Sequence, residues 1–304
     1  MKESITMQDW LKTWERPVKK SSLKTYKSYE RAHIIPFWGQ IHLDEITGAD
    51  LKKFKNFLSK KLAGKTVQDI LSYLNTILQD AEKQGHLVRP ELPKVKVPQR
   101  EKEILDYREH KRLSQWLRQS TSPKDVGILL ALSTGMRLGE VLGLRQKDID
   151  LDTGVLHVRH NRQRIYNPQT NTYPVEDLTP KTQKSRRDIP LHPGLRAVLK
   201  NYMATQKKPN KNQPLIVGPT GKAYDAKTMA YRFDQLKKEL NLNPGLTFHS
   251  LRHSFATRAL ELGSDMGTVS VLLGHSSVSF TLSRYSHCVT EQKRRQMEKI
   301  AECF

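Results

Sequence analysis

The chain has 304 residues, 37% hydrophobic and 27% charged, a composition typical of a globular protein that excludes an intrinsically disordered one. Its formal net charge is +21, and residues 1–99 and 100–304 each carry an excess of Lys and Arg, so a polyanion is the expected partner. Cys288 and Cys303 are too few for a disulfide framework, and no apolar run approaches the ~20 residues of a membrane span, so we expect a cytoplasmic protein without membrane association.

The first ninety residues predict a small helical domain. Thr6 can cap a helix, and Thr47 with Asp50 three residues later resembles a capping box. Between residues 67 and 81 the apolar side chains recur at helical spacing, so one face of that helix belongs to a core. We expect four helices with basic flanks within residues 1–88.

A proline-rich segment follows, and residues 89–101 are the expected linker. Its prolines are interspersed with charge and show no periodicity, which is typical of an extended connection. The segment either crosses a phosphate backbone as a strap or is an ordinary solvated linker. The candidate DNA-binding residues in the linker and in the helix opened by Thr47 are Lys52, Lys53, Lys94, Lys96 and Arg100.

The remaining residues, 102–304, predict a second domain that is mainly helical with one small antiparallel sheet. Strand-like runs occur at 155–158 and 187–191, and residues 162–190 are otherwise rich in turn-forming residues. Helices are expected near 108–119, 123–134, 193–205, 226–240, 248–262, 265–273 and 290–302.

Two arginines stand where they could bind a phosphodiester. Stabilising the extra charge of the transition state is the main task in phosphoryl transfer, and the arginine fork can bind two phosphate oxygens without losing its proton. Arg137 follows a buried-looking helix and a Thr-Gly turn, so its position is fixed. Arg252 lies three residues after His249 and therefore on the same helical face. A surface charge is the alternative for either arginine alone.

Tyr285 is the candidate nucleophile. A phenol, with an ordinary pKa of ~10, can be deprotonated with help and can later leave again. His249 and His275 are candidate acid–base and hydrogen-bonding groups. The spacing of His249 and His253 would also suit a metal, but Arg252 beside a cation would be repulsive. We therefore expect no metal and a structural role for His253.

Four segments together resemble the boxes of the tyrosine recombinases, also called the phage integrase family. The matching segments, in the family's order, are Thr134–Glu140, Thr179–Leu191, Thr247–Thr257 and Leu273–Ser277 followed by Tyr285. The preceding helices resemble the family's SAM-like core-binding domain. The resemblance implies a core-binding domain and a catalytic domain that together form a C-shaped DNA clamp.

The resemblance also implies roles at the scissile phosphate. Tyr285 attacks it to give a 3′-phosphotyrosine, and Arg137 and Arg252 bind its non-bridging oxygens. His275 adds a hydrogen bond there.

Three further roles are implied for proton transfer and support. His249 assists proton transfer at the tyrosine, and Lys181 donates a proton to the departing 5′-oxygen, with Lys184 as its rival. Glu140 supports the arrangement without touching DNA. No metal, nucleotide or other cofactor is implied.

The function implied is that of a site-specific DNA recombinase of a mobile element, working as a homo-tetramer on double-stranded DNA through a Holliday junction. The helix at 290–302 would dock on a neighbouring subunit, and an excisionase or a host DNA-bending protein is a further candidate partner. Bound to DNA, the enzyme would be nucleoid-associated. A type IB topoisomerase-like enzyme and a catalytically silent DNA-binding regulator are the alternatives. The chain starts at the core-binding domain, so either its site is simple or an arm-binding domain has been removed.

Overall fold

The computed structural model divides the chain into two compact units. One comprises Met1–Glu101 with Ile165–Pro174, and the other comprises Lys102–Arg164 with Val175–Phe304. The expected linker thus falls within the first unit, and the predicted domain boundaries stay a prediction. The structure describes residues 4–15, 20–98, 103–167, 169–170, 172–178, 186–206, 211–275, 277–279, 281–282, 285, 297–298 and 301.

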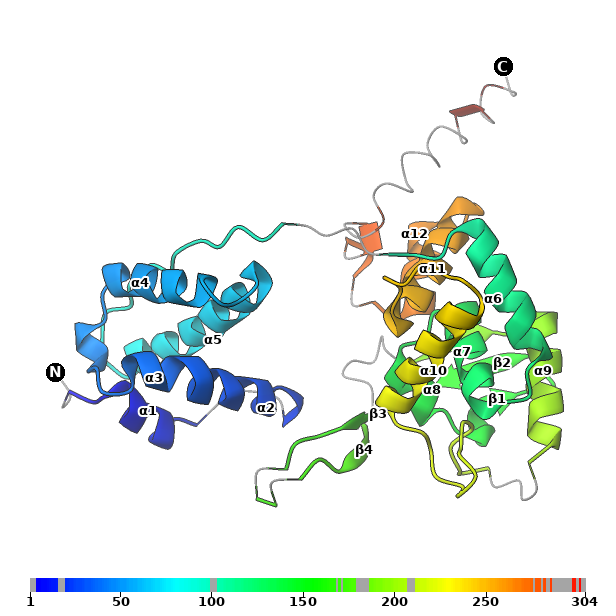
Figure 1. Ribbon diagram of the computed structural model, residues 1–304, viewed down its shortest axis with the longest axis horizontal. Coiled ribbons are helices and arrows are strands. Elements are labelled where there is room, and N and C mark those ends of the chain that lie inside the picture. The colour runs from blue at the N-terminus through cyan, green and yellow to red at the C-terminus, as the bar shows by residue number, and fades with distance from the viewer. Residues whose placement is uncertain are drawn as a thin grey trace. The chain divides into compact units, whose positions relative to one another are not determined.

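The first unit is helical, as predicted. Thr6 accepts a hydrogen bond from the backbone of Asp9, and Thr47 forms the expected capping box with Asp50. These side chains satisfy donors that a helix leaves open in its first turn. In chain order the elements are α1 (Met7–Thr13), α2 (Lys20–Tyr29), the π-helical segment η1 (Glu30–Ile34), α3 (Ile35–Trp38), the short 3₁₀ turn η2 (Leu43–Glu45), α4 (Gly48–Ser59) and α5 (Gly64–Lys83) (Figure 1).

The proline-rich segment after α5 is docked on the first unit. Arg89 donates hydrogen bonds from its backbone and from its guanidinium to side chains of α5, over 3.0 and 2.9 Å. Leu92 and Val95 pack against the core of this unit, whereas Lys94 and Lys96 are exposed. The alternation keeps the apolar side chains on the protein and leaves the two ammonium groups accessible to a partner.

Helix α7 (Pro123–Thr134) is the centre of the second unit. Its residues from Val126 to Leu132 are all buried, because helices on several sides pack against it. A helix that is apolar all round requires such an environment. The surrounding elements are α6 (Tyr107–Gln119), α8 (Leu138–Gly143), the 3₁₀ turn η3 (Gln146–Asp148), α9 (Pro193–Ala204), α10 (Ala226–Glu239), α11 (Phe248–Glu261) and α12 (Met266–Leu273) (Figure 1).

Two small antiparallel sheets complete the second unit. The three-stranded sheet has the order β1 (Ile149–Asp150), β2 (Val155–Val158) and β5 (Arg187–Pro190), and its last two strands are those predicted. The other sheet is the hairpin of β3 (Asn161–Arg164) and β4 (Val175–Leu178), where we expected turns.

The expectation of a single sheet was therefore wrong, for a physical reason. The strands of the hairpin read NRQR and VEDL, polar sequences without apolar alternation. Arg162 and Asp177 face each other in register, and Nε and Nη2 of the arginine donate to the carboxylate over 2.6 and 2.7 Å. The hairpin is also held by β3 packing against Gly139 of α8, where a Cβ would lie 2.8 Å from the carbonyl oxygen of Arg162.

Two further expectations concern membrane association and the C-terminal helix. None of the helices in the described ranges is long and apolar enough to cross a membrane. The predicted helix at 290–302 lies outside the described residues except at 297–298 and 301.

The docking of the proline-rich segment can be tested by paired substitutions. Replacing Leu92 and Val95 together with Ser should lower the free energy of unfolding by about 2 kcal/mol, because both half-buried side chains lose apolar contact. Replacing Lys94 and Lys96 with Ser should change it by less than about 0.5 kcal/mol. Denaturant titration of the full chain measures both. Equal losses in the two variants would show that the apolar contacts do not hold the segment.

Candidate active site

A left-handed glycine ends α7 and sets the position of Arg137. Gly135 has a φ of 66°, a conformation that other residues rarely adopt. A Cβ there would lie 2.6 Å from Phe255 and 2.7 Å from Leu273, so packing also excludes a larger residue. Arg137 then caps α8, and its backbone N–H donates to Glu140 over 2.9 Å. The Thr-Gly turn and the cap fix this arginine from both sides.

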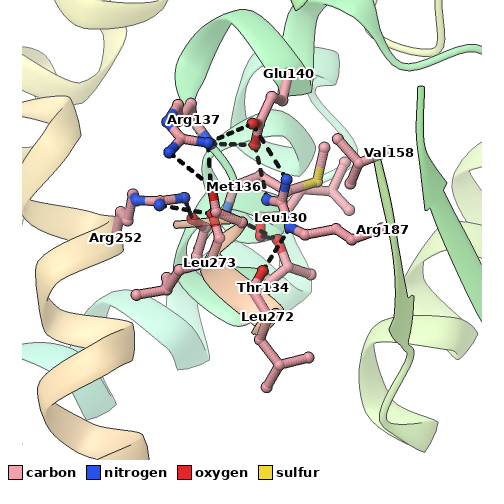
Figure 2. A network of polar contacts seen from close by, with 12 residues as sticks. Leu130, Thr134, Met136, Arg137, Glu140, Val158, Arg187, Arg252, Leu272 and Leu273 are labelled. Atoms are coloured by element: carbon pink, nitrogen blue, oxygen red, sulfur yellow. Dashed lines mark hydrogen bonds and ion pairs between the residues drawn. The ribbon is translucent and has the colours of Figure 1, made fainter. Parts of the chain in front are cut away.

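Glu140 is a buried carboxylate shared by two arginines (Figure 2). Only 3% of its surface is exposed. Its Oε1 accepts from Nη1 of Arg137 over 2.8 Å, and Arg187 donates through both Nη atoms over 3.2 and 2.8 Å (Figure 2). Burial tends to raise the pKa of this carboxyl, but the charges and hydrogen bonds of Arg187 and Arg137 outweigh it and lower the pKa to about 2. Glu140 is therefore ionised at neutral pH.

The C-terminal end of α12 is a second anchor for the arginines. The carbonyls of residues 272–274 accept, in order, from Arg187 over 2.6 Å, from Arg252 over 2.6 Å and from Arg137 over 3.2 Å. The last carbonyls of a helix have no partner within the helix and carry partial negative charge, so cations are stabilised there. Three guanidinium groups from separate parts of the chain thereby converge on one helix end.

Arg252 is the most enclosed of the predicted cations. It is 3% exposed, and its Nη1 donates to the carbonyl of Gly135 over 2.7 Å. Burial, followed by the nearby charge of Arg137, lowers its pKa to about 9, which leaves it protonated at neutral pH. Within the described part of this network there are three guanidinium groups and one carboxylate: Glu140 binds Arg137 and Arg187, while Arg252 is held by backbone carbonyls. The excess of positive charge suits an anion.

Tyr285 lies in a small apolar cluster against α11 and α12. It is 3% exposed and packs with Ala256, Leu260 and Val269. Its hydroxyl hydrogen-bonds to Nδ1 of His253 over 2.7 Å. Because His253 directly follows Arg252 in α11, this contact brings Tyr285 to the helix that carries that arginine.

The predicted histidines lie close to these groups. His249 is exposed on α11, and its ring meets that of His253 edge-on, with centroids 4.6 Å apart. Nδ1 of His275 hydrogen-bonds to Thr281 over 2.7 Å, directly after the end of α12. Across the described residues, no group of His, Cys, Asp or Glu is arranged to hold a metal ion.

The structure thus joins Arg137, Glu140 and Arg252 in one network and brings Tyr285 to the same helix as His249. Three other expectations, Lys181, its rival Lys184 and Arg100, lie outside the described residues. The four remaining candidate DNA-binding residues are all exposed on the first unit: Lys52, Lys53, Lys94 and Lys96. The functional roles of all these residues stay predictions.

Sequence reasoning missed two contacts of the site: that of Arg187 with Glu140 and that of His253 with Tyr285. Arg187 begins β5, where burial alternates, and it faces inward like Ile189. A charged residue at an inward position of a strand could have revealed it, since a buried charge needs a partner. His253 was expected to be structural; it contacts the Tyr285 hydroxyl, and that expectation stays a prediction. Its helical spacing from His249 was visible, but its contact across 32 residues was not.

Comparison with known proteins agrees with the fold and the boxes. Residues 99–292, more than half of the chain, match the phage integrase family, and residues 5–59 match the N-terminal SAM-like domain of phage integrases. A protein named tyrosine recombinase XerC-like, from Caldanaerobacter subterraneus subsp. tengcongensis, is 27% identical over 99% of this chain and 84% of its own. The tyrosine recombinase XerD of Staphylococcus epidermidis is 26% identical over 90% of this chain and 87% of its own.

Solved structures share the fold. The Tn1549 transposon integrase in complex with circular intermediate DNA has a TM-score of 0.81 at 22% identity, covering 98% of this chain and 100% of its own. The lambda integrase tetramer bound to a Holliday junction has a TM-score of 0.67 at 20% identity, covering 92% of this chain and 78% of its own.

A SAM-like helical domain joined to a helical domain with paired arginines and a late tyrosine defines the fold of the tyrosine recombinases. The chain belongs to the phage integrase family. It is a site-specific DNA recombinase, and the matches favour this class over a type IB topoisomerase-like enzyme or a silent regulator.

The buried carboxylate gives a prediction on acid stability. The pKa of Glu140 is lower in the folded chain than its usual 4.5, so its ionised form stabilises the fold above that value and this contribution disappears as pH falls towards about 2. Glu140→Gln should therefore lower the free energy of unfolding by about 3 kcal/mol at neutral pH, and the difference from the natural protein should shrink in acid.

Denaturant titrations at a series of pH values measure this difference. Glu239→Gln is the matched control, because the Glu239 carboxylate also pairs with an arginine, Arg232, but its side chain is 46% exposed. Its effect should stay below about 1 kcal/mol. A Glu140→Gln difference that does not vary with pH would contradict the assigned ionisation.

Proposed function

We propose that this recombinase cuts and rejoins double-stranded DNA through a 3′-phosphotyrosyl bond to Tyr285 and exchanges strands through a Holliday junction. The observation that carries the proposal is the fixed placement of two arginines near the tyrosine. Glu140 and a carbonyl at the end of α12 anchor Arg137, and another carbonyl there anchors Arg252, while the Tyr285 hydroxyl bonds to His253, the residue that follows Arg252 in α11. A phosphate bound by both arginines would lie within reach of that hydroxyl.

The chemistry suits these groups. Charge develops on the phosphate oxygens during transfer, and guanidinium groups that are already oriented stabilise it without reorganising. A tyrosyl ester preserves the energy of the broken phosphodiester, so rejoining needs no ATP. The proposal accordingly involves no metal ion and no cofactor.

The remaining roles complete the proposed reaction. His275 would hydrogen-bond the phosphate, and Lys181, with Lys184 as its rival, would donate a proton to the departing 5′-oxygen. His249 would assist proton transfer at the tyrosine. Glu140, which is 3% exposed, would act only through the arginines it holds.

Double-stranded DNA is the proposed substrate, which fits the net charge of +21. The integrases with which the chain shares its fold have been solved with DNA, one of them as a tetramer on a Holliday junction. We propose that this chain also acts as a tetramer, in which the segment 290–302 is exchanged between subunits. An excisionase or a DNA-bending protein would have a supporting role. The cytoplasm and nucleoid are the proposed location.

Replacement of the nucleophile tests the proposal directly. Tyr285→Phe removes only the hydroxyl, so the variant should bind DNA normally yet form no SDS-stable adduct with a nicked suicide substrate. Tyr107→Phe is the matched control, since this exposed ring over Arg258 should not affect adduct formation. An adduct formed by Tyr285→Phe would refute the assignment of the nucleophile.

The proposed lysine contacts predict a change in salt dependence. Each phosphate neutralised contributes about −0.9 to the slope of log affinity against log salt. Replacing Lys94 and Lys96 with Ser should therefore make that slope shallower by up to about 2. The same change at Lys147 and Lys200, two exposed lysines outside the proposed contacts, should leave it unaltered. Equal salt slopes for the two double variants would show that the docked segment does not contact DNA.

A further inference from the structure

We propose that His253 is a catalytic residue whose Nδ1 accepts the proton of the Tyr285 hydroxyl as the tyrosine attacks DNA. This inference rests on the proposed function, in which Tyr285 is the nucleophile, and it deepens that function by naming the proton acceptor.

The geometry is that of a base in contact with its acid. Nδ1 of His253 and the hydroxyl oxygen of Tyr285 are 2.7 Å apart, within the range over which a positioned side chain takes a proton. Only 6% of His253 and 3% of Tyr285 are exposed, so bulk water has little access to this pair. A phenol with an ordinary pKa of ~10 is almost fully protonated at neutral pH, so a neighbour that takes its proton assists the attack.

The proton and electron balance closes within the proposed reaction. The step requires the tautomer whose neutral ring carries its hydrogen on Nε2. The Nδ1 lone pair then takes the hydroxyl proton while the tyrosine oxygen forms its bond to phosphorus. The bond from phosphorus to the 5′-oxygen breaks, and that oxygen takes a proton from the group proposed for this step, Lys181. In rejoining, each proton returns, and the imidazolium of His253 protonates the departing tyrosine.

The surrounding charges would make the transfer depend on DNA. His253 follows the buried cation Arg252 in α11, and a positive charge near a site disfavours a second one there. A bound phosphate would offset that cation, so the imidazolium becomes more favourable once the substrate is in place. Among the described residues, the ionisable groups at this region include His249, Arg252 and Tyr285, and a hydrogen-bond network links Arg252 to Arg137, Glu140 and Arg187 through the end of α12.

Helix α12 has no ionisable side chain between Met266 and Leu273. Between α7 and α10, Asp125 is engaged by Arg232 over 2.8 and 3.2 Å.

His249 has a different relation to the tyrosine. Its ring meets the ring of His253 at 89°, and the side chain is exposed. The assistance to proton transfer proposed for His249 would therefore act through the His253 ring, which it holds in place as a positioning residue. The two histidines can be separated by experiment, because only the acceptor controls the pH dependence of attack.

The decisive variant is His253→Asn. The asparagine oxygen can occupy the place of Nδ1 and accept the hydrogen bond, but it cannot take the proton. Single-turnover adduct formation on a suicide substrate is followed from about pH 5 to about pH 9, a range that spans the ordinary imidazole pKa of ~6.5. The natural protein should show a rate that rises through the imidazole range and then levels off.

In His253→Asn the rate should fall by ~10²–10⁴-fold, lose that rise, and increase only towards the alkaline end as the phenol ionises. His192→Asn is the matched control, because His192 accepts a hydrogen bond as the N-cap of α9 and Asn serves equally there. If His253→Asn does not fold or bind DNA, His253→Gln, whose amide would lie near the position of Nε2, replaces it.

A substrate with sulfur in place of the bridging 5′-oxygen separates the two ends of the reaction. Its leaving group needs no proton, so the defect of Lys181→Ala should be relieved on it and the defect of His253→Asn should persist. Relief of the His253→Asn defect would overturn the proposal, because it would place that histidine at the leaving group.

Three other results would also overturn it: a His253→Asn rate like that of the natural protein, a lower rate with an unchanged pH profile, or loss of the rise in His249→Asn instead. The proposed function fails separately, and takes this inference with it, if the natural protein forms no adduct at any pH or if Tyr285→Phe still forms one.

Discussion

The buried carboxylate of Glu140 is the interaction on which the rest of this site depends. Two arginines, one from the turn after α7 and one from β5, meet at a side chain that is 3% exposed. Without that negative charge the guanidinium groups would repel one another in a poorly solvated place. With the carboxylate present, the guanidinium groups stay charged and oriented. The conformational entropy of their side chains is lost when the protein folds and not when an anion binds. An anion that arrives later finds donors already aimed.

Backbone geometry contributes as much as side-chain charge. Gly135 and Gly274 both adopt left-handed conformations, one at the end of α7 and the other at the end of α12. A Cβ on Gly274 would lie 3.0 Å from Nη1 of Arg187, so the second glycine also makes room for the cation. Both helices therefore end in a backbone conformation that residues other than glycine rarely adopt, at the positions where the arginines are anchored. Unusual backbone conformations of this kind are typical of functional sites.

The proposed nucleophile is part of the folded core. Tyr285 contributes to a small apolar cluster, and its one polar atom is held by His253 on the helix that also carries Arg252. Its reactivity is therefore set by packing between α11 and α12 as well as by the acidity of a phenol. Under the proposed mechanism a bound phosphate would change the charge around this pair, and activation of the tyrosine would then depend on the presence of DNA.

Much of this protein was determined by local sequence. Capping residues such as Thr6 and Thr47, and the apolar spacing of α5 and α7, located helices because those signals act within a few residues. The order of the boxes identified the family and hence the two-part fold. The β3–β4 hairpin escaped because its strands are polar, and its pairing depends on Arg162 meeting Asp177 fifteen positions away.

Only the tertiary structure decided how the site is held. Arg187 reaches Glu140 across 47 residues, and Tyr285 reaches His253 across 32. Such contacts arise when helices and strands pack, and no periodicity or spacing within one segment records them. The sequence by itself therefore determined which chemical groups the chain carries and which helices present them. The packing of α7, α11, α12 and β5 decided which of those groups meet, because their energies depend on burial and distance.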